Sequence, residues 1–194
     1  MNLPNQLTVA RLGLTLVFVA LLSGIPGTWV KTAALLVFSI AATTDFLDGY
    51  LARRLGMITN FGKLMDPLAD KVLMTAGFVL LSGLDLIPAW AVVLILAREF
   101  LVTGLRLVAS AEGVVLAADS AGKYKTTLQI VTVIYFLVYL ASAEPLLNFL
   151  RPLFGVFYLG PDHLGVVLIG VSLVLTLWSG GRYMWRNREL LKDC

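Results

Sequence analysis

The sequence contains few charged side chains, one histidine and one cysteine. Charged residues make up 14% of the 194 residues, whereas an ordinary soluble domain carries roughly 25%. The lone cysteine, Cys194, excludes a disulfide within the chain. One histidine and one cysteine also leave no cluster of the ligands that structural zinc sites use, which argues against a zinc-binding module. The shortage of charge excludes an ordinary soluble domain.

The chain contains long apolar runs. Hydrophobic residues make up 59% of the chain, and its mean hydropathy is +0.89. Because a helix needs about 20 apolar residues to cross a bilayer, we expect an all-α integral membrane protein with about six transmembrane helices. These helices would form a single domain, residues 1–194. The apolar segments fall near residues 6–25, 31–52, 64–83, 87–108, 126–143 and 164–181.

Lysine and arginine gather at one end of the alternating segments, and only Lys31 and Arg151 fall at the other. Membrane proteins carry an excess of basic residues on the cytoplasmic side. We therefore expect both termini and residues 45–70 to be cytoplasmic. The residues at the basic end are Arg11, Arg53, Arg54, Lys63, Lys71, Arg98, Arg106, Lys123, Lys125, Arg182, Arg186, Arg188 and Lys192.

One polar stretch, DFLDGYLARRLGMITNFGKLMDPLAD at residues 45–70, interrupts the apolar pattern. Its polar residues recur with the period of a helix, about 100° per residue. Two adjacent antiparallel helices would therefore present four carboxylates to a shared space. The residues that share a face are Asp45, Asp48, Gly49 and Ala52 in the first helix, and Gly62, Asp66 and Asp70 in the second.

Four clustered carboxylates require compensating positive charge. Hard divalent cations prefer oxygen ligands of this kind, so we expect Mg²⁺ or Mn²⁺ here. Two such ions would neutralise the cluster and could clamp a pyrophosphate. The alternative is a loop of solvated aspartates that pair with neighbouring basic residues. Those neighbours are Arg53, Arg54, Lys63 and Lys71.

The same spacing resembles the signature of a known family. Asp45-x₂-Asp48-Gly49-x₂-Ala52-Arg53-x₈-Gly62-x₃-Asp66-x₃-Asp70 is similar, without a departure, to the signature of the CDP-alcohol phosphatidyltransferases. These six-span membrane enzymes move a phosphatidyl or phosphoalcohol group from a CDP-linked donor to an alcohol. The resemblance implies metal binding by Asp45, Asp48, Asp66 and Asp70, catalysis by Asp70 as the base, and donor binding by Asp48, Gly49, Arg53 and Gly62.

Four further segments extend the resemblance over nearly the whole chain. They are NLPNQLTVARL, LAREFLVTGLRLVA, GKYKTT and LTLWSGGRY. They are similar to bacterial members that use CDP-diacylglycerol as donor and sn-glycerol 3-phosphate as acceptor. The resemblance therefore implies these two substrates, a homodimer and a place in the bacterial inner membrane. No nucleic-acid partner is expected.

Two arginines lie inside the fourth apolar segment, where charge is costly. Arg98 and Arg106 are eight residues apart, so they share one helix face, which we expect to point inward. Lys123 and Lys125 begin the next segment at the same end. Because arginine binds phosphate in a bidentate manner, we expect these four cations to bind the phosphate of the acceptor.

Two assignments have a structural alternative. The four cations could instead anchor the protein at the membrane surface or pair with Glu99 and Glu112. Asn5 and Thr8 could line the site, as the Asn-x-x-Thr pattern of the family suggests, or cap the first helix. Residues 179–181, Ser-Gly-Gly, are expected to serve close helix packing rather than chemistry.

Other functions compete with this hypothesis. A divalent-cation transporter would also need carboxylates within the membrane, but polar groups would then line a path through it. Here the acidic residues lie at one depth. A scaffold protein with a structural metal would leave the nearby arginines without a purpose. Within the family, the alternatives are a cardiolipin synthase and a phosphatidylinositol-phosphate synthase, which differ in their acceptor.

Overall fold

A computed structural model describes residues 3–55, 60–111, 120–156 and 160–188. The side chains of residues 3–5, 45–55, 60–67, 70, 111, 120–121, 123 and 156 lie outside the described part. The described chain is helical, with no strand. Its six long helices are α1 (Leu3–Leu22), α2 (Val30–Leu55), α3 (Asn60–Gly83), α4 (Ala89–Ala111), α5 (Ser120–Ala141) and α7 (Val166–Arg186). The connection from α5 to α7 contains short helical turns at Asn148–Leu150, α6 (Arg151–Val156) and Pro161–Gly165.

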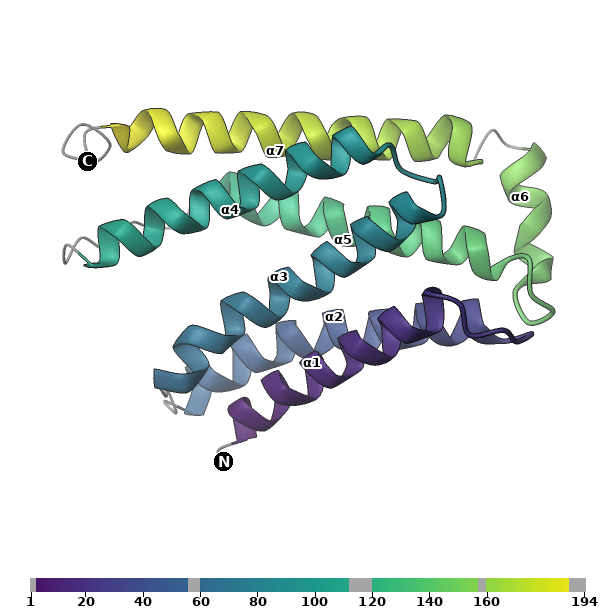
Figure 1. The fold of residues 1–194 in the computed structure, drawn as a ribbon, viewed down its shortest axis with the longest axis horizontal. Coiled ribbons are helices and arrows are strands. Elements are labelled where there is room, and N and C mark those ends of the chain that lie inside the picture. The colour runs from purple at the N-terminus through teal and green to yellow at the C-terminus, as the bar shows by residue number, and fades with distance from the viewer. Residues whose placement is uncertain (1–2, 56–59, 112–119, 157–159, 189–194) are drawn as a thin grey trace.

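Consecutive long helices run in opposite directions (Figure 1). α1, α3 and α5 begin at one end of the bundle, and α2, α4 and α7 end there. We call this end, where α2 ends at Leu55 and α3 begins at Asn60, the polar end. α1 packs on α2 and α3, α2 packs on α5, and α7 packs on α4 and α5. The predicted basic ends of the alternating segments therefore do meet at one end of the molecule.

Each of the six apolar segments expected from the sequence lies mainly within one long helix, but some boundaries differ. α3 begins at Asn60 rather than near residue 64, and α5 begins at Ser120 rather than near residue 126. In both helices the extra first turns are polar. Hydropathy marks only the apolar part of a helix, whereas the backbone hydrogen bonds continue into the polar turns.

The outer surface of the bundle suits a lipid environment. Within the described residues, two helices are long and apolar enough to cross a membrane, Tyr124–Ala141 and Pro161–Arg186. Large apolar side chains point outward from several helices: Leu16 is 72% exposed, Val93 63% and Val174 65%. Soluble proteins rarely expose apolar surface in contiguous patches. The composition, the helices and this surface are those of an all-α membrane protein.

Four phenylalanines form part of the apolar core where α1, α2, α3 and α5 meet. Phe18, Phe38, Phe78 and Phe136 are at most 1% exposed. The rings of Phe18 and Phe38 lie 5.2 Å apart, in a tilted arrangement. This packed region fixes α3 against α5 and so holds the polar residues described below at a constant depth.

A buried carboxylate at the opposite end fastens the α5–α7 connection to α2. Glu144 accepts hydrogen bonds from the backbone N–H of Lys31 and of Thr32, both at 2.8 Å, and from the Thr32 hydroxyl at 2.6 Å. Burial alone would raise the pKa of Glu144, but these hydrogen bonds and the charge of Lys31 hold that pKa below its ordinary value. The carboxylate thus satisfies N–H groups of the first turn of α2, where negative charge is favourable.

Candidate functional site

The aspartate segment forms parts of two helices. Residues 45–53 belong to the last turns of α2, and residues 62–70 belong to the first half of α3. The predicted helical backbone is therefore confirmed, and the two stretches meet at the polar end (Figure 1). The alternative of an unstructured loop does not describe these stretches, because both are helical.

The carboxylates of the four aspartates and the side chain of Arg53 lie outside the described part of the structure. Among the described side chains, no three His, Cys, Asp or Glu residues gather closely enough to hold a metal ion. The prediction that Asp45, Asp48, Asp66 and Asp70 bind metal, and that Gly49, Arg53 and Gly62 bind the donor, therefore stays a prediction. The chemistry of the donor set fits Mg²⁺ or Mn²⁺, since all its ligands are carboxylate oxygens.

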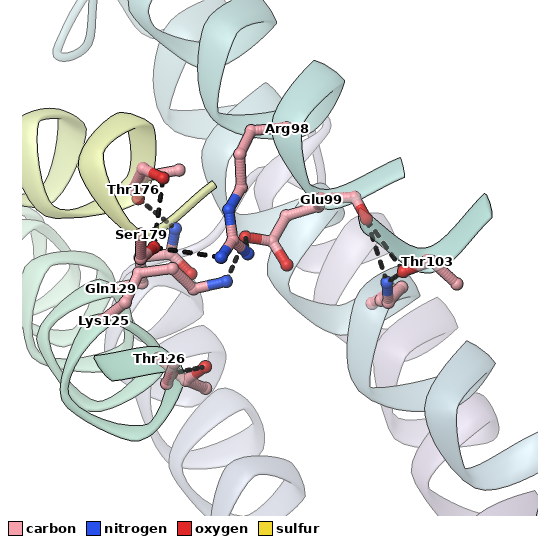
Figure 2. A network of polar contacts seen from close by, with 10 residues as sticks. Arg98, Glu99, Thr103, Lys125, Thr126, Gln129, Thr176 and Ser179 are labelled. Atoms are coloured by element: carbon pink, nitrogen blue, oxygen red, sulfur yellow. Dashed lines mark hydrogen bonds and ion pairs between the residues drawn. The ribbon is translucent and has the colours of Figure 1, made fainter. Parts of the chain in front are cut away.

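Next to this segment lies a cluster of described cations around one carboxylate, Glu99 of α4 (Figure 2). Lys125 of α5 forms an ion pair with Oε1 of Glu99, and only 4% of the lysine side chain is exposed. Nη1 of Arg98 donates to the same oxygen at 3.2 Å. Nη2 of Arg98 donates to Oγ of Ser179 on α7 at 2.9 Å. One carboxylate oxygen therefore joins cations from two helices, and a third helix is attached through the arginine.

A third cation, Lys71, shows where this cluster lies along the bundle relative to the aspartate segment. Its Nζ donates to the Glu99 carbonyl oxygen at 3.2 Å and to the hydroxyl of Thr103, both on α4. Because Lys71 follows Asp70 directly in α3, residue 70 lies at the level of the cation cluster. A small cavity between α3, α4 and α5 has a polar lining formed by Lys71, Thr75, Glu99, Thr126 and Gln129.

Deeper in the bundle, hydrogen bonds between side chains join α5 to α7. The Gln129 amide donates to Thr176 at 3.1 Å, and the hydroxyls of Thr132 and Ser172 lie 3.0 Å apart. All four side chains are at most 3% exposed. Hydrogen bonds of this kind hold helices together in a membrane, where the hydrophobic effect does not drive helix association. They place the start of α5, with Lys125, against α7.

Arg106 occupies a separate place, two helical turns beyond Arg98 toward the polar end. Its Nε donates to the hydroxyl of Tyr183 on α7 at 3.1 Å, and its guanidinium carbon lies 5.2 Å from the centre of that ring. Tyr183 is 5% exposed, whereas Arg106 is exposed. The prediction that both arginines share one face of α4 is confirmed, since both contact α7, but the expectation that Arg106 points inward is wrong. Its guanidinium contacts α7 through Tyr183 while the residue stays exposed.

The structure brings together only some of the predicted acceptor residues. Arg98 and Lys125 meet at Glu99, so the pairing with Glu99 that the sequence left open does occur. The side chain of Lys123 lies outside the described residues. Thr8 is fully buried in α1. Asn5 is not the N-cap of α1, because the helix already begins at Leu3, and its side chain lies outside the described part.

Sequence reasoning missed the polar side chains of α7 that join it to α4 and α5. Ser172, Thr176 and Ser179 all point from α7 into the bundle, although the segment around them reads as apolar membrane helix. Their spacing of four and three residues places them on one helix face, and this is the signal that could have found them. Lys71 entered the sequence hypothesis as a basic residue of the cytoplasmic end and as an ion-pair partner of the aspartates, not as a contact of α4.

Among the described side chains, two cations of this cluster share one carboxylate. Arg98 and Lys125 both pair with the carboxylate of Glu99. Nε of Arg98 is buried and has no hydrogen-bond partner among the described residues. Excess charge inside a membrane protein is costly unless it is paired, and it usually marks a binding site or ion pathway. The geometry therefore suits an anion near the polar end, beside the aspartate segment.

Comparison with known proteins agrees with this geometry. The family described as CDP-alcohol phosphatidyltransferase matches residues 1–178, and the chain belongs to this family. A relative from Bacillus subtilis named CDP-diacylglycerol–glycerol-3-phosphate 3-phosphatidyltransferase is 39% identical over 98% of this chain and 97% of its own length. A relative of the same name from Escherichia coli is 35% identical over 99% of this chain and 98% of its own length. Another of that name, from Rickettsia typhi, is 35% identical over 94% of this chain and 94% of its own length.

Proposed function

We propose that this protein transfers the phosphatidyl group of CDP-diacylglycerol to sn-glycerol 3-phosphate, giving phosphatidylglycerophosphate and CMP. The observation that carries the proposal is similarity over nearly the full length to several relatives named for this reaction. An acceptor that carries its own phosphate also fits the two cations, Arg98 and Lys125, that share Glu99 among the described side chains. A cation transporter, the alternative from another class, is not supported, because the chain belongs to a family of transferases.

The acceptor would bind through its phosphate to Arg98, Lys125 and Arg106, with Lys123 as a further candidate. These cations come from α4 and α5. Arginine and lysine form strong, charge-assisted hydrogen bonds to phosphate oxygens. Binding at this level would place the acceptor beside residue 70, since the neighbouring Lys71 contacts α4 at Glu99 and Thr103.

In the transfer step, the primary hydroxyl oxygen of the acceptor bonds to the phosphorus that carries the diacylglycerol. The bond from that phosphorus to the oxygen of CMP breaks, and CMP leaves with the bonding electrons. The proton of the hydroxyl passes to the carboxylate of Asp70, which acts as general base. Gly49, Arg53 and Gly62 would hold the CDP group of the donor, with Asp48.

Asp45, Asp48, Asp66 and Asp70 would hold the metal, Mg²⁺ or Mn²⁺, and we propose two ions. When bound, these ions would offset the negative charge of the donor pyrophosphate and of the leaving group. The stretches that carry the aspartates are helical and adjacent, which is the arrangement that a shared carboxylate site requires. Asn5 and Thr8 are candidates for lining the same space from α1.

The six long helices support six membrane spans with both termini on the cytoplasmic side. Lysine and arginine concentrate at the polar end, in agreement with the cytoplasmic excess of basic residues. The named relatives are bacterial proteins. We therefore place this protein in the bacterial inner membrane, with its site facing the cytoplasm, and propose that it works as a homodimer, as expected for the family.

The test is CMP release by purified protein in mixed micelles with CDP-diacylglycerol. Glycerol 3-phosphate, phosphatidylglycerol and inositol 1-phosphate are offered separately, each with and without Mg²⁺. Metal-dependent release with glycerol 3-phosphate alone is the expected result. Release only with phosphatidylglycerol would identify a cardiolipin synthase instead. Release only with inositol 1-phosphate would identify a phosphatidylinositol-phosphate synthase instead. No release from folded protein would refute the proposed activity.

A further inference from the structure

α7 contacts both arginines of α4 through a short stretch near its polar end. Ser179 and Gly180 contact Arg98, and Tyr183 contacts Arg106. We propose that this stretch positions the cations that bind the acceptor phosphate, so that α7 determines acceptor affinity without touching the substrate. This inference rests on the proposed function, because it presupposes that these cations bind the acceptor.

Gly180 lies where the Arg98 side chain crosses α7. A Cβ at position 180 would lie 2.5 Å from Cγ of Arg98 and 2.9 Å from its Nε. Those distances are too short for carbon in van der Waals contact. The collision is with the stem of the arginine near its own backbone, so any larger residue would have to push the whole guanidinium away. Glycine at position 180 therefore leaves the space that the side chain of Arg98 occupies.

Ser179 fixes the far end of the same side chain. Its Oγ accepts from Nη2 of Arg98 at 2.9 Å and donates to the carbonyl oxygen of Thr176 at 3.1 Å. Ser179 is 1% exposed, so water does not compete for this hydroxyl. The donated hydrogen bond turns the lone pair of Ser179 toward the arginine, which leaves the guanidinium one favoured position.

The position of Arg98 is passed on to Lys125 through Glu99. Nη1 of Arg98 donates to Oε1 of Glu99 at 3.2 Å, and the same oxygen accepts from Lys125. A shift of Arg98 therefore moves the oxygen that holds Lys125. The chain of contacts runs from α7 through α4 to α5, and it ends on the most deeply buried lysine of the cluster.

Tyr183 acts in the same way on Arg106. Its ring is buried with Val102 and Leu105 of α4, and its hydroxyl accepts from Nε of Arg106. Both Nη groups of Arg106 have no part in this hydrogen bond and stay available for phosphate. Tyr183 lies four residues after Ser179, so both residues share the face of α7 that packs on α4.

The test compares Ser179→Ala, Gly180→Ala and Tyr183→Phe with Gly181→Ala. Gly181 is the matched control, because a Cβ at that position meets nothing within 4 Å and the residue is exposed. Full-length protein is assayed in mixed micelles for kcat and for both KM values, and its thermal unfolding is followed. Ser179→Thr, which keeps the hydroxyl, is the conservative variant.

Loss of one hydrogen bond predicts a rise of about 3- to 10-fold in the KM for glycerol 3-phosphate for Ser179→Ala and Tyr183→Phe. Gly180→Ala should raise this KM more. The KM for CDP-diacylglycerol should stay within about twofold in these three variants, and Gly181→Ala and Ser179→Thr should behave like the parent protein. A merely structural role would instead lower the unfolding temperature and the yield of active protein without changing the acceptor KM selectively.

Arg98→Ala and Lys125→Ala separate failure of this inference from failure of the proposed function. If they raise the acceptor KM while all three α7 variants leave it unchanged, the acceptor site stands and the role of α7 is refuted. If Arg98→Ala and Lys125→Ala leave the acceptor KM unchanged as well, the assignment of the cations fails, and the inference fails with it. A selective rise of the acceptor KM in the α7 variants and in the Arg98 and Lys125 variants supports both the acceptor site and the role of α7.

Discussion

Lys125 of α5 and Glu99 of α4 form an ion pair inside the bundle, and that carboxylate is shared with Arg98. Breaking a buried ion pair leaves an uncompensated charge, so such pairs are costly to disrupt. The pair also holds the ammonium group of Lys125 at the level of residue 70, because Lys71 contacts the backbone of Glu99. Glu99 thus contacts cations from three helices, Arg98 and Lys125 through its carboxylate and Lys71 through its backbone carbonyl.

Replacing Lys125 by Met should weaken acceptor binding. A hydrogen bond to a charged group contributes about 1.5–3 kcal/mol, so the KM for glycerol 3-phosphate should rise by roughly 10- to 100-fold. The measurement is initial CMP release at saturating CDP-diacylglycerol. Lys125→Arg should retain part of the affinity, and Lys31→Met, at the opposite end, should not change the KM. A lower kcat with an unchanged acceptor KM would contradict this assignment.

Asp70→Asn should mainly reduce the rate. Removal of a general base costs roughly 10²–10⁴-fold, and the amide has nearly the same shape as the carboxylate, so folding should persist. Single-turnover CMP release measures the effect. Asp85→Asn is the matched control: Asp85 lies at the opposite end with φ 58°, a conformation that asparagine tolerates. Near-normal turnover in Asp70→Asn would exclude this residue as the base.

Removal of divalent metal should abolish activity and leave the fold intact. The carboxylates of the aspartate segment would then lack their counter-ions, while the apolar core around Phe38 and Phe78 would remain. EDTA is added to the purified protein, and activity is measured before and after addition of Mg²⁺ or Mn²⁺. Helical content is followed by circular dichroism. Activity that persists after chelation would rule out the metal site proposed here.

Glu144→Gln should destabilise the protein without changing its kinetics. Loss of charge-assisted hydrogen bonds to the first turn of α2 costs about 1–3 kcal/mol, which thermal unfolding in micelles would detect. The control is Asp162→Asn, at an exposed position of the same connection. Equal unfolding temperatures for Glu144→Gln and the parent protein would show that the contact contributes nothing.

The effect of Glu144 should depend on pH in a defined direction. Its pKa is lowered in the folded protein, so the stabilisation is complete above the pKa of the unfolded chain, about 4.3. It disappears as the pH falls through the lower pKa of the folded state. The difference in unfolding temperature between the parent protein and Glu144→Gln should therefore be constant near neutral pH and shrink in acid. A difference that persists in acid would point to shape rather than charge.

The site was only partly readable from the sequence. The helical period of Asp45, Asp48, Asp66 and Asp70 predicted two helical stretches, and the backbone of α2 and α3 has them. The period also placed Arg98 and Arg106 on one face of α4. It could not show that Arg106 is exposed, because the exposure depends on how α7 ends beside α4.

The sequence by itself determined the helices, their alternation and the residues that carry charge within them, because hydropathy and helical period act locally. Tertiary structure alone decided which polar side chains meet. Arg98 and Ser179 are 81 residues apart, and Gln129 and Thr176 are 47 apart. No local pattern connects such pairs; they are joined because packing sets the register of α7 against α4 and α5. The same packing sets Gly180, an ordinary glycine in the sequence, directly against the side chain of Arg98.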